Sequence, residues 1–356
     1  MDLRILGWDA FFEEGFGKYR DAGFIQARIT ARQANLFTAI SEAGEMRGKV
    51  SGRMRYECAE SGDFPVVGDW VAVKGNPETG VMTIHAVLPR KTKFMRAEYD
   101  RDAYQGDQVV CANLDVLFIV LALDQEFNVK SLERYTAQAA VSGSKAVVIL
   151  NKSDLCGNFE QVLAQARSVA RDIPIIATSA KSGQGLQEIG KYLAEGVTGS
   201  LVGPSGAGKS TIINALLGEE RMTTAEVRDY DSKGRQTTTH RELVILPGRG
   251  MLIDNPGLRG LGITGDQGLV ASAFEDVEAL IGKCKFSNCQ HRTEPGCAIK
   301  EALADGTLSE DRFESYKHFQ RELQVISVKK SQRTKLGKDV SKAIKRRQKF
   351  EKERYS

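Results

Sequence analysis

The sequence has few cysteines and no long apolar stretch, and both absences exclude classes of protein. Six cysteines in 356 residues are too few for the disulfide framework of a small secreted domain, so a reducing, cytoplasmic location is expected. The longest apolar run, residues 116–123, is far shorter than the roughly 20 residues that span a bilayer, so no membrane association is expected. Residues 1–4 carry an early aspartate and lead into no long apolar segment, so no secretory signal is expected. The length predicts two or three domains of a globular protein.

Residues 203–210 form a complete phosphate-binding loop, G-x-x-x-x-G-K-S. A short buried strand is predicted before it at 197–202 and a helix after it at 211–217, which is the context that this motif requires. Backbone N–H groups of such a loop surround phosphate oxygens; Lys209 would reach the β and γ phosphates, and the Ser210 hydroxyl would hold Mg²⁺. The alternative is a glycine-rich turn that binds nothing. The expected nucleotide contacts are Gly203, Pro204, Ser205, Gly206, Ala207, Gly208, Lys209, Ser210 and Thr211.

Three further motifs, each at the end of a predicted strand, favour guanine nucleotide binding. The first is N-K-S-D at 151–154, whose last residue, Asp154, can accept two hydrogen bonds from guanine where adenine has no matching donors. The second is S-A-K at 179–181, and the third is D-N-P-G at 254–257. Asp254 is expected to meet Mg²⁺ and the Gly257 N–H the γ-phosphate. The expected base contacts are Asn151, Lys152, Ser153, Asp154, Ser179, Ala180 and Lys181.

The order of the motifs differs from that of an ordinary small GTPase, in which the phosphate-binding loop comes first. Here the base-reading motifs at 151–154 and 179–181 precede the loop at 203–210, and D-N-P-G follows it. Ligands gather at the carboxyl ends of parallel strands whatever the connectivity, so a circularly permuted chain can build the same site.

A second candidate site lies near the carboxyl end of the sequence. Cys284, Cys289, His291 and Cys297 follow the pattern C-x4-C-x-H-x5-C. Three thiolates and one imidazole suit a closed tetrahedral Zn²⁺ site, with Lys283 and Lys285 beside it to balance the charge. No further catalytic group is evident beside them, so one structural zinc ion per chain is expected. The alternative is that these cysteines are ordinary core residues.

With the four nucleotide motifs and the Cys/His pattern, the sequence resembles the ribosome-small-subunit-dependent GTPase A family, of the RsgA or YjeQ type, over roughly residues 30–320. The predicted fold class is α/β, a circularly permuted P-loop GTPase domain between an OB-like β-barrel and a helical zinc-binding module. The predicted domains are a leader (1–25), the barrel (26–92), the GTPase domain (93–262), the zinc-binding helical domain (263–327) and a basic tail (328–356).

The barrel and the tail are candidate RNA contacts. About five short β-like runs between residues 26 and 90 predict a small barrel, which would either bind RNA or serve as a packing module. The tail has a net charge of +9 against +4 for the whole chain, and would either be a solvated helix or contact a phosphate backbone. Candidate phosphate contacts in the barrel region are Arg53, Arg55, Lys74, Arg90, Lys91 and Lys93.

The residue that orients the attacking water is not the usual one, because Leu258 occupies the position of the glutamine that commonly follows D-x-x-G. The resemblance implies a histidine immediately before a threonine triplet, but this sequence has Gln236 there. Gln236 is the predicted water-orienting residue, and His240 is the alternative. Either Thr238 or Thr239 is expected to join Mg²⁺ in the GTP state.

The resemblance implies a GTP hydrolase that the small ribosomal subunit activates and that acts as a late maturation checkpoint on that subunit. Its expected partners are the small subunit, its rRNA and GTP or GDP, with Mg²⁺ and one Zn²⁺ as cofactors and a monomeric chain. The alternative is a GTP-dependent RNA-binding scaffold, or an enzyme that acts on another RNA.

Overall fold

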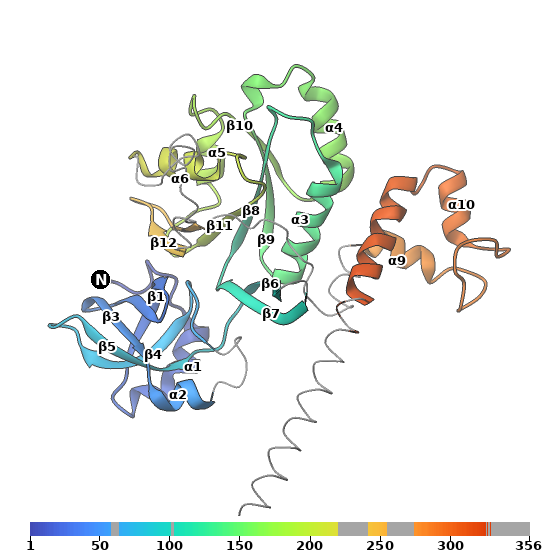
Figure 1. The fold of residues 1–356 in the computed structure, drawn as a ribbon. Coiled ribbons are helices and arrows are strands. Elements are labelled where there is room, and N and C mark those ends of the chain that lie inside the picture. The colour runs from blue at the N-terminus through green and yellow to red at the C-terminus, as the bar shows by residue number, and fades with distance from the viewer. Residues whose placement is uncertain are drawn as a thin grey trace, which may run out of the picture. The chain divides into compact units, whose positions relative to one another are not determined.

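The computed structural model describes residues 1–57, 64–100, 103–219, 241–254, 274–324, 326 and 328. The chain divides into two compact units (Figure 1). The first unit consists of Met1–Arg96 and Gln108–Leu261, and the second of Ala97–Asp107 and Gly262–Ser356. In the described residues, no helix is both long and apolar enough to cross a membrane.

The amino-terminal part of the first unit is a closed five-stranded barrel. Its strands run in the order β1-β2-β3-β5-β4, and β1 also pairs with β4, which closes the barrel. The strands are β1 (Ile25–Gln33), β2 (Leu36–Ser41), β3 (Gly44–Val50), β4 (Trp70–Asn76) and β5 (Val81–Val87). The predicted OB-like barrel is therefore confirmed. Only glycine fits at position 48, because a Cβ there would lie 1.7 Å from the Met82 carbonyl oxygen of β5.

The predicted leader contains a helix, α1 (Ala10–Arg20), which begins where the Asp9 carboxylate accepts a hydrogen bond from the Phe11 N–H. Phe12 and Phe16 on this helix are buried in the same apolar cluster as Trp70 of the barrel. A second short helix, α2 (Gly52–Glu57), follows β3. The leader is thus part of the core of the first unit.

The GTPase part is built on a mainly parallel sheet in the order β10-β9-β8-β11-β13-β12. Only the edge strand β12 is antiparallel to its neighbour in this part. The sheet confirms the predicted doubly wound, circularly permuted fold. The strands are β8 (Val116–Ala122), β9 (Lys145–Asn151), β10 (Ile175–Thr178), β11 (Thr198–Val202), β12 (Arg241–Ile245) and β13 (Met251–Asp254).

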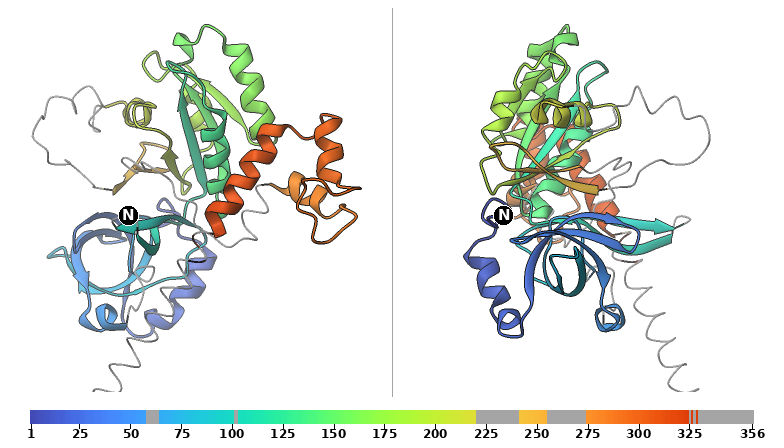
Figure 2. Two further views of the ribbon diagram at one scale, coloured as in Figure 1. Left: turned by 45° about the vertical axis from the view of Figure 1, so that its right-hand side comes forward. Right: turned by 90° about the vertical axis from the view of Figure 1, so that its left-hand side faces the viewer.

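Alternate residues of the central strand β8 face two different cores, since side chains along a strand point to opposite faces. Leu117 and Ile119 pack in one apolar cluster, and Phe118 and Val120 pack in the other. The first cluster is covered by α3 and α4, and the second by α5 and α6 (Figure 2). Because both faces of β8 are buried, its sequence is a continuous apolar run. The helices are α3 (Val129–Ser142), α4 (Phe159–Ala170), α5 (Leu186–Gly190) and α6 (Lys209–Leu217).

The barrel and the GTPase sheet are continuous. Strand β1 pairs antiparallel with β12, with Ala31 opposite Glu242 and Arg32 opposite Arg241, so that the combined sheet has 11 strands. Two strands outside this sheet, β6 (Lys93–Asp100) and β7 (Ala103–Ala112), pair with each other. In the second unit, the structure describes α9 (Glu275–Ile281), α10 (Ala298–Ala304) and a helix over residues 310–324.

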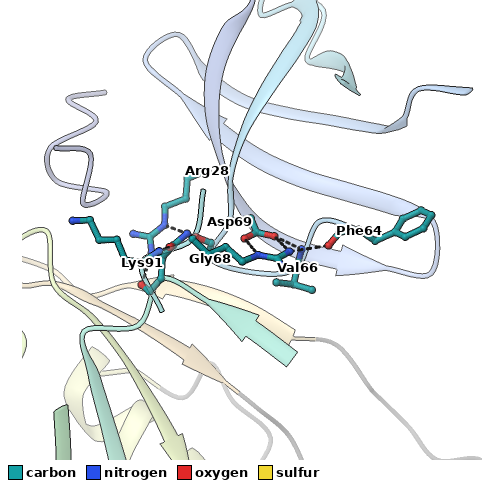
Figure 3. Close-up of polar contacts among 8 residues, drawn as sticks. Arg28, Phe64, Val66, Gly68, Asp69 and Lys91 are labelled. Carbon is teal, nitrogen blue, oxygen red and sulfur yellow. Dashed lines mark hydrogen bonds and ion pairs between the residues drawn. The ribbon is translucent and has the colours of Figure 1, made fainter. Parts of the chain in front are cut away.

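One buried arginine, Arg28, connects the leader, the barrel and the GTPase part. Arg28 is fully buried, and its guanidinium donates to the backbone carbonyls of Leu6, Gly68 and Asn113. Burial lowers its pKa to about 10, so it stays charged at neutral pH. Figure 3 shows the Arg28 side chain beside Gly68, which Asp69 follows in the chain.

The prediction that Arg90 contacts RNA is wrong. Its Nε and Nη2 atoms each lie 2.7 Å from the carboxylate of Asp69, which is fully buried, and its side chain is only 14% exposed. Burial raises the pKa of Asp69, and the hydrogen bonds from Arg90 counteract that effect. Lys91 is paired with Asp9 and lies over the rings of Phe11 and Phe12. Arg53, Arg55, Lys74 and Lys93 are exposed, so they stay candidate RNA contacts.

Candidate active site

The carboxyl ends of five neighbouring parallel strands, β10, β9, β8, β11 and β13, lie at the same edge of the sheet. Asn151 at the end of β9 is the strand partner of Thr178 on β10 and of Ala122 on β8. Strand β11 leads into the phosphate-binding loop, and β13 beside it ends at Asp254. The four predicted motifs therefore start at one edge, where open parallel sheets bind ligands.

The phosphate-binding loop runs from β11 to the start of α6 and depends on glycine at two crowded positions. A Cβ on Gly203 would lie 2.0 Å from the Val120 carbonyl oxygen, and one on Gly208 would lie 2.2 Å from Nδ2 of Asn151. Both glycines also have positive φ, 149° and 90°, which side-chain-bearing residues rarely adopt. The sequence predicted a helix from 211, and the structure starts α6 two residues earlier, at Lys209.

Asn151 connects three of the motifs through its side chain, which is 2% exposed. Its Nδ2 donates to the carbonyl of Ala207 in the phosphate-binding loop at 2.8 Å. Its Oδ1 accepts from the Thr178 hydroxyl and from the Ala180 N–H, both at 3.1 Å. One buried amide thus fixes the spacing of the N-K-S-D, S-A-K and phosphate-binding segments. The sequence identified Asn151 as a base contact, but not this linking role.

Two lysines of the site have protein partners. The Lys209 ammonium donates to the carbonyls of Gly203 at 2.9 Å and Pro204 at 2.6 Å, both in its own loop. Lys152 has a positive φ of 61° and forms an ion pair with Asp124, 2.5 Å from Nζ to Oδ2. Asp124 follows the end of β8, and sequence reasoning missed it because no motif marks it.

The other predicted nucleotide contacts divide into described and undescribed residues. Asp154, in the short η2 helix (Ser153–Leu155), is exposed and accessible to a base. Asp254 is 9% exposed at the end of β13. Ser179 and Ala180 are buried and Lys181 is exposed. The predictions for Gln236, Thr238, Thr239, His240, Gly257, Leu258 and residues 329–356 of the tail lie outside the described residues.

The structure brings the four predicted metal ligands together. One ligand atom from each of Cys284, Cys289, His291 and Cys297 lies within 4.8 Å of all the others. Nδ1 of His291 is 3.6 Å from the Cys284 sulfur and 3.4 Å from the Cys297 sulfur. Burial lowers the pKa of His291, which favours the neutral imidazole that binds metals. The donor set therefore fits a metal ion.

Glu294 supports this cluster and was missed by sequence reasoning. Its carboxylate accepts hydrogen bonds from the N–H groups of Gln290, Arg292 and Thr293, at 3.0, 2.8 and 3.0 Å. Hydrogen bonds from its own backbone N–H and from those neighbours lower its pKa to about 2. The carboxylate thus organises the turn that carries His291.

The chain is similar to known proteins over most of its length. Residues 87–264 match the RsgA GTPase family. Proteins called small ribosomal subunit biogenesis GTPase RsgA from Opitutus terrae and Syntrophotalea carbinolica are 44% and 39% identical to this chain. The first alignment covers 90% of each protein; the second covers 89% of this chain and 88% of the relative.

Two solved structures have a similar fold. YjeQ from Thermotoga maritima superposes with a TM-score of 0.62 at 26% identity, covering 84% of this chain and 99% of that one. YloQ, described as a circularly permuted GTPase, superposes with a TM-score of 0.59 at 20% identity, covering 85% of this chain and 95% of its own. The predicted resemblance and the predicted permutation are both confirmed.

Proposed function

This chain belongs to the RsgA GTPase family and is a GTPase, and from that premise we propose that it acts late in small ribosomal subunit assembly and that the subunit activates its hydrolysis. The relatives' name, small ribosomal subunit biogenesis GTPase, supports the biological role. The observation that carries the enzymatic part is the Asn151 side chain, which holds the base-reading and phosphate-binding segments in one arrangement.

Different residues of the chain are assigned to binding the base, the phosphates and the metal ion. Asp154 selects guanine, and Asn151 fixes the segments around it. Residues 203–208 direct backbone N–H groups at phosphate oxygens, and Lys209 exchanges its two carbonyl partners for the β and γ phosphates. Mg²⁺ bound with GTP would neutralise charge on the phosphates, with Ser210 and Asp254 as its protein ligands.

For the catalytic step we propose Gln236 as the residue that orients the attacking water, with Thr238 or Thr239 completing the shell around the γ-phosphate. Both assignments rest on the sequence. Leu258 in place of the common glutamine makes slow intrinsic turnover the expectation, and a partner that positions residues 234–240 around the γ-phosphate is the expected route to activation.

For the second unit we propose a structural zinc ion held by Cys284, Cys289, His291 and Cys297. Three thiolates with one imidazole, packed within 4.8 Å, support zinc over harder cations, which prefer oxygen ligands. The module, the barrel and the basic tail would contact rRNA on a monomeric protein that works in the cytoplasm, without a membrane.

The main competing function is a GTP-dependent scaffold, or an enzyme acting on another RNA, for which hydrolysis would not depend on the small subunit. GTP hydrolysis and nucleotide release should therefore be measured with purified small subunits, large subunits and tRNA in parallel. The proposal expects stimulation by small subunits alone. Equal stimulation by tRNA or large subunits would favour the competing function.

A further inference from the structure

Three half-buried arginines come together where the barrel meets the GTPase sheet. Arg32 on β1 is the strand partner of Arg241 on β12, so their side chains lie on one face of the sheet, with Cβ atoms about 5 Å apart. The charge of Arg96, on β6, also acts on Arg241. This arginine cluster (Arg32, Arg96 and Arg241) collects three positive charges from three separate elements.

In the part of the chain that the structure describes, no carboxylate pairs with any member of the arginine cluster. Arg32 donates from Nε to the Ala34 carbonyl at 3.2 Å, and its guanidinium lies 5.3 Å from the Phe37 ring centre. Arg96 donates from Nε to Oε1 of Gln108 at 3.0 Å. These partners are neutral, so the groups to which Arg32 and Arg96 donate do not compensate their charges.

Two other half-buried arginines of this protein are each paired with an acid. Arg90 lies 2.7 Å from Asp69, and Arg312 lies 3.1 Å from Asp276. For Arg241, burial lowers the pKa, Cys111 opposes that effect, and the two neighbouring arginines lower the pKa further. Like charges directly opposite on paired strands are destabilising. The arginine cluster is therefore electrostatically unfavourable unless an anion binds it.

We propose that the arginine cluster binds a phosphate group of an RNA backbone. The planar guanidinium, with its fork of N–H donors, matches phosphate oxygens better than any other side chain. None of the three arginines is fully buried, and Arg32 is followed by the exposed residues 33–36 at the turn between β1 and β2. Ribosomal RNA as the source of the phosphate rests on the proposed function.

A phosphate bound at the arginine cluster would also affect the pairing between the barrel and the GTPase sheet. Arg32 and Arg241 lie on the two strands that join the barrel to the GTPase sheet, β1 and β12 (Figure 1). A phosphate between them would replace their repulsion with attraction and stabilise that pairing.

The test compares Arg241→Gln and Arg32→Gln with Arg167→Gln, a matched loss of one charge on the exposed face of α4. The thermal midpoint of each GDP-loaded protein is measured without RNA, and binding to small subunits is measured over a range of salt concentrations. Removing one like charge should leave the midpoint unchanged or raise it. It should weaken subunit binding about tenfold and reduce the salt slope by roughly one unit, while Arg167→Gln changes neither.

Two further ligands, a short RNA duplex and sodium pyrophosphate, show whether the cluster binds a phosphate of RNA or a free phosphate compound. Both are added to the GDP-loaded protein, so that the phosphate-binding loop is already occupied. A short RNA duplex should raise the thermal midpoint of the unmodified protein and of Arg167→Gln, but not of Arg241→Gln. If sodium pyrophosphate gives that pattern and the duplex does not, the site takes a free phosphate compound and the RNA assignment is overturned. Unchanged binding of the duplex and of small subunits, with a lowered midpoint in both variants, would mean that the arginines are structural.

Binding of the RNA duplex also distinguishes a failure of this inference from a failure of the proposed function. If small subunits bind poorly to every protein but the duplex discriminates Arg241→Gln from Arg167→Gln, the arginine cluster binds RNA and the ribosomal assignment fails. If small subunits stimulate hydrolysis equally in all variants and bind them equally, the proposed function holds and the phosphate site does not exist.

Discussion

Replacing Asn151 with alanine tests whether one buried amide holds the nucleotide site together. The change removes three hydrogen bonds of 2.8, 3.1 and 3.1 Å and leaves the Ala207 carbonyl, the Thr178 hydroxyl and the Ala180 N–H without that partner. At about 1 kcal/mol for each neutral bond, the GTPase part should lose about 3 kcal/mol of stability. GDP affinity should fall roughly ten- to a hundredfold, because the base and phosphate segments lose their common anchor.

The assays are a urea titration, followed by tryptophan fluorescence and circular dichroism, and a titration with a fluorescent GDP analogue. Asn158→Ala is the matched control, because Asn158 is exposed and its amide lies at a long 3.4 Å from Gln161. The control should stay within about 0.5 kcal/mol of the unmodified protein. If Asn151→Ala binds GDP as tightly as Asn158→Ala does, the linking role assigned to this side chain is wrong.

Three other changes have distinct expected outcomes. Asp154→Asn should weaken GTP binding and favour xanthosine triphosphate, as measured by competition; equal affinity of the unmodified protein for GTP and ATP would contradict this base assignment. Cys289→Ser should lower bound zinc from about one ion per chain, measured by metal analysis, and reduce ribosome binding with little effect on GDP affinity; a metal-free preparation with a fully folded second unit would count against it. Deleting residues 328–356 should weaken subunit binding and flatten its salt dependence, with the saturated hydrolysis rate largely kept.

The local features of the fold were predictable from the sequence because they depend on near neighbours. The helix predicted over 211–217 after the phosphate-binding loop ends where α6 ends, and α6 starts only two residues earlier. Each nucleotide motif directly follows an apolar run, so its place at a strand end follows from local pattern alone. The Cys/His spacing likewise placed four ligands within a short segment, and the structure brings them together.

The features that the sequence did not predict depend on contacts between residues that are far apart in the chain. The pairing of β1 with β12 joins residues about 210 positions apart, and nothing near either strand in the sequence indicates the partner. Arg90 was one of the basic residues of the barrel region considered as phosphate contacts, but a buried acid 21 residues earlier, Asp69, binds it. The close approach of like charges in the arginine cluster also cannot be predicted from the sequence, since it depends on which residues the strand register places opposite each other.

Single-turnover GTP hydrolysis at saturating small subunits, with Gln236→Ala measured beside the unmodified protein, is the most direct test of the central claim. Subunits should raise the rate of the unmodified protein by orders of magnitude over the protein alone. The rate of Gln236→Ala should fall back toward the intrinsic value while GTP affinity changes little, because the contact forms mainly in the transition state. An unmodified protein that hydrolyses GTP at the same rate with and without small subunits would contradict the account.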